Sequence, residues 1–269
     1  MLIRYGYTVD LEFSQPTPVI TVLDIHPERR ADIVTEEEMA VSPPVLSTVY
    51  RDRFGNICRR FMAPAGLVSL HSTGVITDSG VPDAVDRSAG EVRVEDLPSE
   101  TLMYLMGSRY CDTDKLSDVA WNMFGSTRAG FDRVQTIVDF VHNRIKFGYP
   151  FARATRSASE ALEEQVGVCR DFAHLAVALC RCMNIPARYT TGYLGDIGVP
   201  PDPNPMDFSA WFEAFIGGRW HTFDARHNAP RIGRIVMGYG LDATDVAIVN
   251  SFGRHLLKRW DVVTVEAEA

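Results

Sequence analysis

The spacing of apolar residues changes partway along this chain, and that change limits the possible folds more than any other feature. Between residues 131 and 145, apolar side chains recur at alternating intervals of three and four, which is typical of one face of an amphipathic helix. Two more helices are expected, over 157–165 and from Cys169 to the residues before Asn184. Strand patterns then follow over 187–194, 208–216, 220–224, 232–239, 246–252 and 260–266. Helices followed by antiparallel strands predict an α+β fold.

Residues 1–95 have a different pattern and predict a separate domain. They contain short runs rich in β-branched and aromatic residues, and the runs 45–51 and 57–62 flank a turn signal with a glycine and an asparagine. The polar segment 79–100, which carries two prolines, is typical of a linker. We therefore expect a small antiparallel β domain over residues 1–95 and a second domain over residues 96–269.

Composition and charge narrow the partners and the compartment. The 269 residues carry a formal net charge of −8, which argues against nucleic acid and anionic membranes as partners. No apolar run approaches the roughly 20 residues that span a bilayer, and the first residues show no signal-peptide pattern. The five cysteines form no even set, which favours a reducing compartment. We expect a cytoplasmic protein, and none of these features fixes an oligomeric state.

The candidate nucleophile is Cys169. Gly167 permits a tight turn just before the helix that is expected to begin near Cys169. The first N–H groups and the positive end of the helix macrodipole would then lie beside the sulfur and favour thiolate over thiol. The same N–H groups suit an oxyanion hole. The alternative interpretation of Cys169 is a small buried residue at a helix start.

A hairpin downstream defines where the partners of Cys169 would lie. The Gly-Gly pair at 217–218 is a two-residue turn signal between runs of alternating apolar and polar residues. This turn places Asp224 opposite Trp211, with Ser209 two residues farther along the same face. A histidine at position 209 would be a diagonal neighbour of Asp224, which is the base-and-orienter geometry of a Cys/His/Asp triad.

Together these motifs resemble the transglutaminase-like superfamily, which includes transglutaminases, bacterial cysteine proteases and peptide N-glycanases. The resemblance covers residues 127–228. It rests on Gly-x-Cys-x-x-Phe-Ala at 167–173, Ile-Pro-Ala-Arg-Tyr-x-x-Gly-Tyr at 185–193, Ala-Trp-Phe-Glu at 210–213 and Gly-Arg-Trp-x-x-Phe-Asp at 218–224. It implies a papain-like core of helices packed on an antiparallel sheet, and it identifies residues 1–95 with the β domain often found before bacterial members.

The resemblance also implies roles for single residues. Cys169 would be the nucleophile and Asp224 the residue that orients the general base. The family motif His-Ala-Trp is Ser-Ala-Trp at 209–211 in this chain, so Ser209 stands where the family has its base. A serine cannot take up and return a proton at neutral pH as an imidazole does.

Another histidine would then have to supply the base. His227 follows Asp224 by three residues, and a loop could bring it back toward the site. His221 points to the opposite face of its strand, and His174 lies about 140° around its helix from Cys169. The sequence does not place the remaining four, His26, His71, His142 and His255.

Three arginines and two aromatic residues are candidates for substrate contacts. Arg226, Arg231 and Arg234 follow the hairpin and could bind an acidic substrate or the C-terminus of a peptide, and a solvated loop is the alternative. Tyr193 and Trp211 are expected on the substrate side, although a tryptophan in such a strand is most often part of a core.

A metal site is not expected. Cys180 and Cys182 do not have the spacing of metal ligands. Asp202, Asp207 and Glu213 do not follow an EF-hand pattern. We therefore expect neither a metal nor a cofactor.

The expected reaction is acyl transfer at an amide of a peptide or protein through a Cys169 thioester. Water as acceptor would give a cysteine protease or amidase, which we favour, and an amine would give a crosslinking enzyme. The alternatives are a catalytically impaired relative that binds peptides in the retained cleft, and an interaction module with an inert Cys169. Ser209→His is expected to raise thiol reactivity at least about tenfold if the scaffold is otherwise intact.

Overall fold

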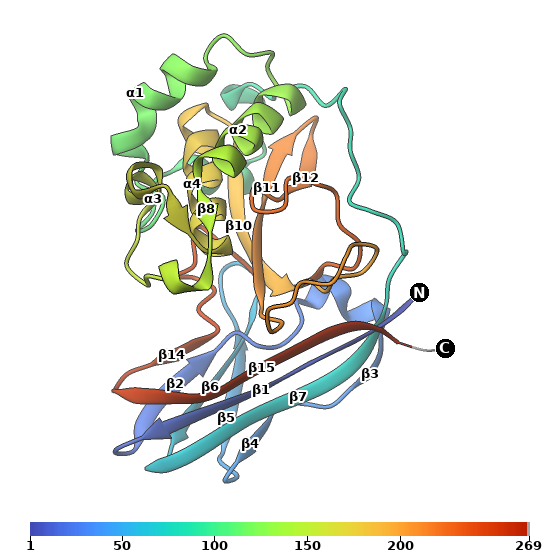
Figure 1. Cartoon of the computed structure of the whole chain (residues 1–269), viewed down its shortest axis with the longest axis vertical. Helices are drawn as coiled ribbons and strands as arrows, with labels where there is room; N and C mark the ends of the chain where they lie inside the picture. Colours follow the sequence, from blue (N-terminus) through green and yellow to red (C-terminus); the bar gives the residue numbers. More distant parts are fainter. Residues whose placement is uncertain (268–269) are drawn as a thin grey trace.

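The computed structural model describes residues 1–267, which form a β unit and a mixed unit of helices and sheet (Figure 1). The strands of the β unit are β1 (Leu2–Phe13), β2 (Thr17–Thr21), β3 (Ile33–Glu36), β4 (Ala40–Ser42), β5 (Ser47–Arg51), β6 (Ile57–Ala63), β7 (Gly66–Thr77), β14 (Val249–Ser251) and β15 (His255–Ala267). They form two antiparallel sheets. One has the order β15-β1-β7-β3 with β4 also paired to β7, and the other has the order β14-β2-β6-β5.

The sequence of β1 explains why it lies at the centre of its sheet. Its odd-numbered residues from Ile3 to Phe13 are buried, whereas Arg4 and Glu12 are exposed. This alternation of period two gives one apolar face. That face belongs to an apolar cluster that also includes Tyr193, Phe208, Ile235 and Met237 of the mixed unit. The two units are therefore packed against each other through shared apolar side chains.

The end of the chain returns to the β unit. β15 pairs with β1 from Leu2↔Ala267 to Phe13↔His255, and β14 pairs with β2. The last strands therefore complete the sheets that begin at the N-terminus, and the two ends of the chain lie side by side (Figure 1). The prediction of one domain over residues 96–269 did not include this return. Residues far apart in sequence pair there, and a strand pattern alone does not identify its neighbour.

The mixed unit places helices on one face of a four-stranded antiparallel sheet (Figure 1). Its helices are α1 (Thr113–Phe124), α2 (Phe131–Arg144), α3 (Ala158–Glu164) and α4 (Cys169–Cys182). The sheet has the order β12-β11-β10-β13, with β10 (Ala187–Tyr193), β11 (Ser209–Ile216), β12 (Arg219–Phe223) and β13 (Ile235–Gly240). A short parallel pair, β8 (Lys146–Phe147) and β9 (Val166–Gly167), precedes α4. The predicted α+β fold is confirmed.

Helix α4 is the centre of the mixed unit. Every residue from Asp171 to Cys182 is buried, because α1, α2 and α3 cover it on one side and β10 and β11 on the other. A helix that is surrounded in this way has little freedom to shift. Its first residue, Cys169, is only half-buried.

The segment 78–112 connects the units and runs along the mixed unit (Figure 1). It includes the 3-10 turns η2 (Val94–Asp96) and η3 (Ser99–Leu105). The Asp83 N–H donates to the carbonyl of Arg231, and the Phe131 N–H at the start of α2 donates to the carbonyl of Ala89. The polar segment predicted as a linker is thus hydrogen-bonded to the unit that it leads into. Within residues 1–267, no helix combines the length and apolar character needed to cross a membrane.

Candidate active site

Cys169 lies in the first turn of α4, and Asp171 fixes that turn. The Asp171 carboxylate accepts a hydrogen bond from the Val168 N–H at 2.9 Å and pairs with Arg156 at 2.9 Å. Only glycine fits at position 167, because a Cβ there would lie 2.7 Å from the Cβ of Asp171. The helix start therefore holds the Cys169 sulfur in a defined place, beside N–H groups that have no partner within the helix.

Cys169 lines a small cavity of about 50 Å³. The cavity brings together segments that are distant in sequence, and its lining includes Phe147, Tyr149, Ser209, Arg226, His227 and much of the loop 194–208. A space of this size holds ordered water but no peptide. The loop 194–208, which joins β10 to β11, contributes much of the lining and so limits the space beside Cys169.

The thiol of Cys169 is neutral in this environment. Burial raises the pKa of the Cys169 thiol to about 11; the Arg226 guanidinium lowers it, and the Asp207 carboxylate raises it further. The sequence predicted that the helix start would favour the thiolate. The cost of desolvating a charged sulfur outweighs that effect here. A Cys169 with such a pKa needs a base to take up its proton at neutral pH.

Asp224 ends the hairpin strand β12 and is nearly surrounded by donors. Its Oδ1 accepts the backbone N–H groups of Arg226 and His227, each at 3.0 Å, and its Oδ2 accepts Arg234 at 3.0 Å. Burial opposes ionisation, but the nearby charge of Arg234 and the hydrogen bonds from His227 hold the pKa of Asp224 well below its ordinary value. Asp224 is thus an ionised carboxylate in a buried position.

The imidazole of His227 binds this carboxylate. His227 Nδ1 lies 2.8 Å from Asp224 Oδ2. Because an ionised carboxylate only accepts hydrogen bonds, Nδ1 carries the proton, and Nε2 is left as the basic nitrogen of the neutral ring. His227 and Cys169 line the same cavity. Ser209 lines it as well, and its buried hydroxyl has no hydrogen-bond partner among the described residues.

The hairpin register agrees with the sequence analysis. Ile216 pairs with Arg219 and Phe212 with Phe223, so the next positions along the strands are Trp211 and Asp224. His221 pairs with Ala214, on the face away from Asp224. His174 is buried on the other side of α4, where its Nε2 accepts the Ala243 N–H at 3.1 Å.

Two expected substrate contacts are not at the cavity. Trp211 is fully buried and packs with Val236 and Tyr239, and the Arg234 guanidinium lies 4.9 Å from its ring centre. Tyr193 is fully buried at the junction of the two units, against Tyr5. Both face cores because apolar side chains in these central strands fill the space between layers. Of the three arginines considered for substrate contacts, Arg226 and Arg231 do line the cavity.

Two residues that support the site could not be assigned from the sequence. The Arg234 guanidinium is buried between Asp224 and Asp83, at 3.0 and 2.9 Å, and is not part of a solvated loop. His142 of α2 donates from Nδ1 to the carbonyl of Arg226 at 2.9 Å. Both hold the turn that carries His227. They come from segments whose sequence patterns give no sign of a contact with this turn.

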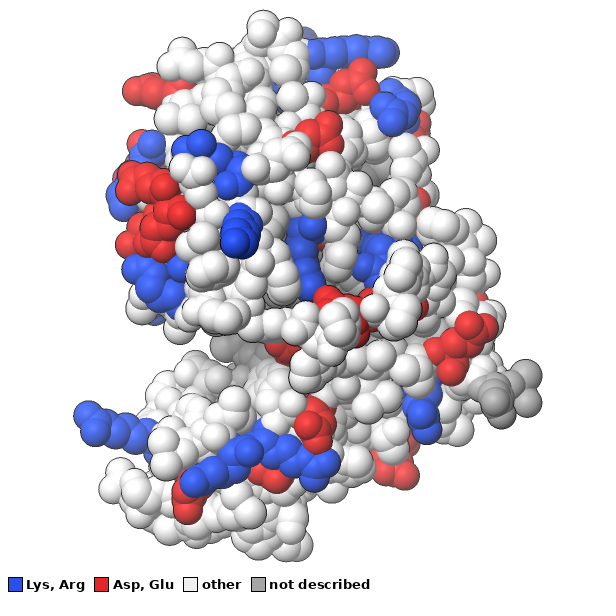
Figure 2. Space-filling model, viewed as in Figure 1, with Lys and Arg blue, Asp and Glu red and all other residues white. Residues whose placement is uncertain are grey.

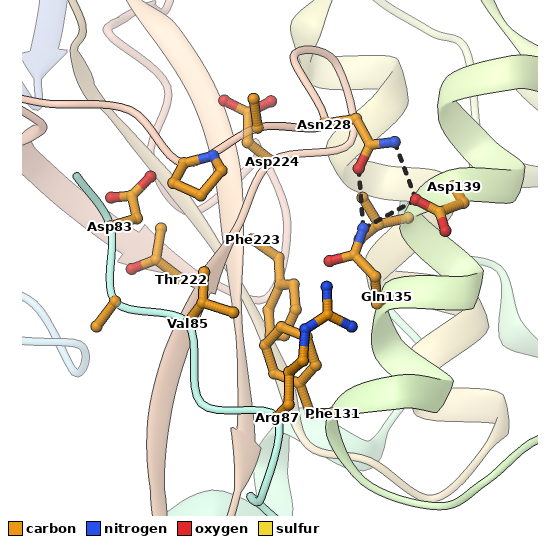
Figure 3. Close-up of a pocket in the computed structure, with 14 residues that line it drawn as sticks. Asp83, Val85, Arg87, Phe131, Gln135, Asp139, Thr222, Phe223, Asp224 and Asn228 are labelled. Carbon is orange, nitrogen blue, oxygen red and sulfur yellow. Dashed lines mark hydrogen bonds between the residues drawn. The ribbon is translucent and has the colours of Figure 1, made fainter.

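A larger cavity of about 390 Å³ is lined in part by Asp224 (Figure 3). Asp83, Val85 and Arg87 of the connecting segment line it together with Phe131, Gln135 and Asp139 of α2. The Asn228 side chain accepts a hydrogen bond from Gln135 and donates one to Asp139, both at 2.9 Å (Figure 3). These bonds fasten the end of the 225–228 turn to α2.

Comparisons with known proteins agree with this geometry. The family model of the transglutaminase-like superfamily matches residues 118–225, from α1 to just beyond Asp224. The crystal structure of a candidate cysteine protease from Cytophaga hutchinsonii is similar over both units. It has a TM-score of 0.87 and 30% sequence identity, and the match covers 100% of this chain and 91% of that chain.

A second relative matches a shorter region. An uncharacterized protein of Mycobacterium leprae is 38% identical over 95 residues, which are 34% of this chain and 33% of that protein. The match thus spans about one third of the length of that relative. Its sequence similarity supports a common origin for the matched region only.

Proposed function

Because this chain belongs to the transglutaminase-like superfamily, we propose that it catalyses acyl transfer at amide bonds through a thioester on Cys169. The proposed acceptor is water, so the net reaction is hydrolysis of an amide in a peptide or protein. One observation carries the proposal: the His227 imidazole, bound to Asp224 at 2.8 Å, lines the same cavity as Cys169. A nucleophile, a base and an orienting acid are the parts of a thiol-dependent acyltransferase.

In the first step, His227 Nε2 takes the proton of the Cys169 thiol while the sulfur bonds to the carbonyl carbon of the amide. The negative charge that develops on the carbonyl oxygen is stabilised by backbone N–H groups at the start of α4. His227 then gives its proton to the leaving amine as the C–N bond breaks. The products are a free amine and a thioester on Cys169.

In the second step, His227 takes a proton from water, and the resulting hydroxide bonds to the thioester carbon. The C–S bond breaks, and the proton returns to the sulfur. Asp224 stays ionised throughout and stabilises the imidazolium that forms in each step. Its low pKa, which Arg234 and His227 maintain, suits this role because the carboxylate does not take the proton itself.

In this proposal, His227 replaces the family histidine whose position Ser209 occupies. The Asp224 carboxylate already accepts four hydrogen bonds, from the side chains of His227 and Arg234 and from two backbone N–H groups. Ser209 is small enough to leave the cavity open beside Cys169. Its unpartnered hydroxyl can bind the attacking water or a substrate carbonyl.

A second candidate function is peptide binding without turnover. It is favoured by the pKa of about 11 for the Cys169 thiol and by the serine at the family position of the base. In that case the cleft would bind peptides, and any acyl group transferred to the thiol would not be released. The two functions therefore differ in the second step.

An activated ester tests the proposal, because it needs no knowledge of the natural amide. The protein is mixed with p-nitrophenyl acetate, nitrophenol release is followed, and the Cys169 peptide is examined by mass spectrometry. We expect an acetyl group on Cys169 that water removes, with continued turnover that is lost in Cys169→Ala and slowed at least about tenfold in His227→Asn. An acetyl group that stays on Cys169 would favour the binding function, and no acetyl group would contradict acyl transfer through Cys169.

A reducing compartment, such as the cytoplasm, is part of the proposal. The five cysteines are all free in the described structure, four of them buried. A thiol nucleophile needs a reduced sulfur.

A further inference from the structure

The three arginines that follow Asp224 have different roles. Arg234 is buried and forms ion pairs with both Asp83 and Asp224. Arg231 is also buried, and its guanidinium binds the carbonyl of Gly195 at 2.9 Å and Asp196 at 3.4 Å. Both guanidinium groups are therefore buried and already paired with carboxylates inside the fold.

Arg226 is held in place but is poorly paired. Its guanidinium lies over the Phe147 ring, 3.8 Å from the ring centre. Its backbone is fixed by Asp224 at the N–H and by His142 at the carbonyl. Among residues 1–267, Asp202 is the one carboxylate within ion-pair distance of its guanidinium, at 3.6 Å, which is too long for a hydrogen bond. The result is a positioned cation with unused donors.

This cation faces the reacting sulfur. Arg226 and Cys169 line the same cavity, and the charge of Arg226 lowers the pKa of the thiol. The nearby acids are engaged elsewhere: Asp224 by Arg234 and His227, and Asp207 by the Trp260 indole N–H at 2.7 Å. Figure 2 shows basic side chains set back in the surface of the mixed unit, with acidic side chains beside them.

Asp202 can be displaced without unfolding the loop that carries it. The ends of the loop 194–208 are anchored, by Arg231 at Gly195 and by Trp260 at Asp207. Residues 198–206 between these anchors are exposed. The Asp202 backbone is bound within the loop, by its N–H to Asp196 at 2.7 Å. A substrate carboxylate could therefore displace the Asp202 carboxylate from Arg226 while the loop stays anchored.

We propose that the site selects acyl donors that carry a carboxylate next to the bond that is broken, and that Arg226 binds this carboxylate in place of Asp202. The inference rests on the proposed function of Cys169 and gives its substrate class: acidic peptides or other amides with an adjacent carboxylate. A guanidinium can bind a carboxylate through two parallel hydrogen bonds. Displacement of Asp202 also opens the cavity. Binding of the substrate carboxylate therefore increases access to the Cys169 sulfur.

Two alkylating reagents test this selectivity without any substrate. Iodoacetate and iodoacetamide are nearly the same size and attack the same thiolate, so the ratio of their rates cancels differences in thiol pKa. The rate with iodoacetate is divided by the rate with iodoacetamide, and this ratio is measured at Cys169 by mass spectrometry. It is then divided by the same ratio for N-acetylcysteine amide, a neutral free thiol. We expect a quotient of about ten for the natural chain, as a charge-assisted hydrogen bond predicts. It should fall as salt is raised.

Variants assign the effect to Arg226. Arg226→Gln should bring the quotient to about one, and Arg226→Lys, which keeps the charge but loses the planar fork, should keep part of it. Asp202→Asn should raise the quotient about threefold, because the competing carboxylate is removed while the arginine stays. Thermal unfolding of each variant shows whether it is folded.

The outcomes separate this inference from the proposed function. A quotient near one in the folded natural chain, or one that Arg226→Gln leaves unchanged, overturns the inference even if alkylation depends on His227. A high quotient in His227→Asn at pH 10, where hydroxide ionises a larger share of the thiol without His227, supports the inference even if the proposed base is wrong. Failure of both reagents at pH 10, under conditions in which they alkylate N-acetylcysteine amide, would mean that the cavity does not open, and the inference would be overturned.

Discussion

The residues around Asp224 strongly stabilise the negative charge of its carboxylate. It is ionised although it is buried, because four donors and the charge of Arg234 offset the loss of solvation. The same contacts orient His227 and connect it to the segment that joins the two units. In the proposed mechanism, a single carboxylate thus combines a structural and a chemical role.

The stabilisation from Asp224 should depend on pH in a defined way. Its pKa is lowered in the folded state, so its contribution is complete above the unfolded pKa of about 4 and is lost as pH falls through the lower folded value. We expect Asp224→Asn to lower the free energy of unfolding by about 2 kcal/mol at pH 7. Urea unfolding at several pH values checks this. A difference between the two proteins that does not shrink below about pH 4 would show that charge is not the cause.

Single residues could be predicted from the sequence where a regular element fixes them. Cys169 is placed by the start of a helix, and Asp224 by the register of a hairpin with a two-residue turn. The sequence leaves His227 as one of several candidate bases, because a turn beyond the end of a strand has no periodicity. Arg234 is missed for the same reason: its two carboxylate partners lie in a connecting segment and at a strand end.

The helices and strands of the mixed unit form a rigid frame that fixes the positions of Cys169, Ser209 and Asp224. α4 is enclosed by the other helices and the sheet, and β11 and β12 bring Ser209 and Asp224 to one edge. The N-terminal turn of α4 is a closely packed part of this frame. Gly167 packs there directly against Asp171.

Gly167→Ala should disturb this turn. The added Cβ would lie 2.7 Å from both the Cβ and the Oδ2 of Asp171, which its partners hold in place. We expect a loss of about 1–3 kcal/mol in the free energy of unfolding, as for other overpacked sites, together with slower alkylation of Cys169. Gly90→Ala is the matched control, since a Cβ at position 90 meets nothing within 4 Å. Equal effects of the two substitutions in urea unfolding would contradict this account of the turn.

The strands of the mixed unit were predicted well, whereas the partners of the last two strands of the chain, which belong to the β unit, were not. The runs over 208–216 and 220–224 alternate around a glycine pair, so both their existence and their register follow from local sequence. β14 and β15 are recognisable as strands, yet their pairing with β2 and β1 depends on contacts more than two hundred residues away in sequence. No local pattern contains that information.

In the whole molecule, the β unit supports the loop that covers Cys169. The Trp260 indole of β15 donates to Asp207 at 2.7 Å, and the Thr264 N–H is bound to the Met206 sulfur. The carbonyl of Thr264 also lies against Gly195. The covering loop is therefore attached to the β unit at both of its ends. We therefore expect the β unit to influence access to the thiol.

Trp260→Phe should loosen this attachment. It removes the donor to Asp207 while it keeps an aromatic ring in place. We expect Cys169 to react about threefold faster with iodoacetamide, since the loss of one hydrogen bond weakens loop closure by about 0.7 kcal/mol. Trp121→Phe, at an exposed position on α1, is the control. An unchanged or lower rate for Trp260→Phe would show that β15 does not hold the loop closed.

The central claim is that His227, oriented by Asp224, is the base for Cys169. The measurement that tests it most directly is the rate of Cys169 alkylation by iodoacetamide from pH 6 to 10, in the natural chain, in His227→Asn and in His71→Asn, an exposed control. We predict that His227→Asn slows the reaction at least about tenfold at pH 7, with the gap closing toward pH 10, and that Ser209→His restores the rate in that variant. Identical profiles for the natural chain and His227→Asn would contradict the account.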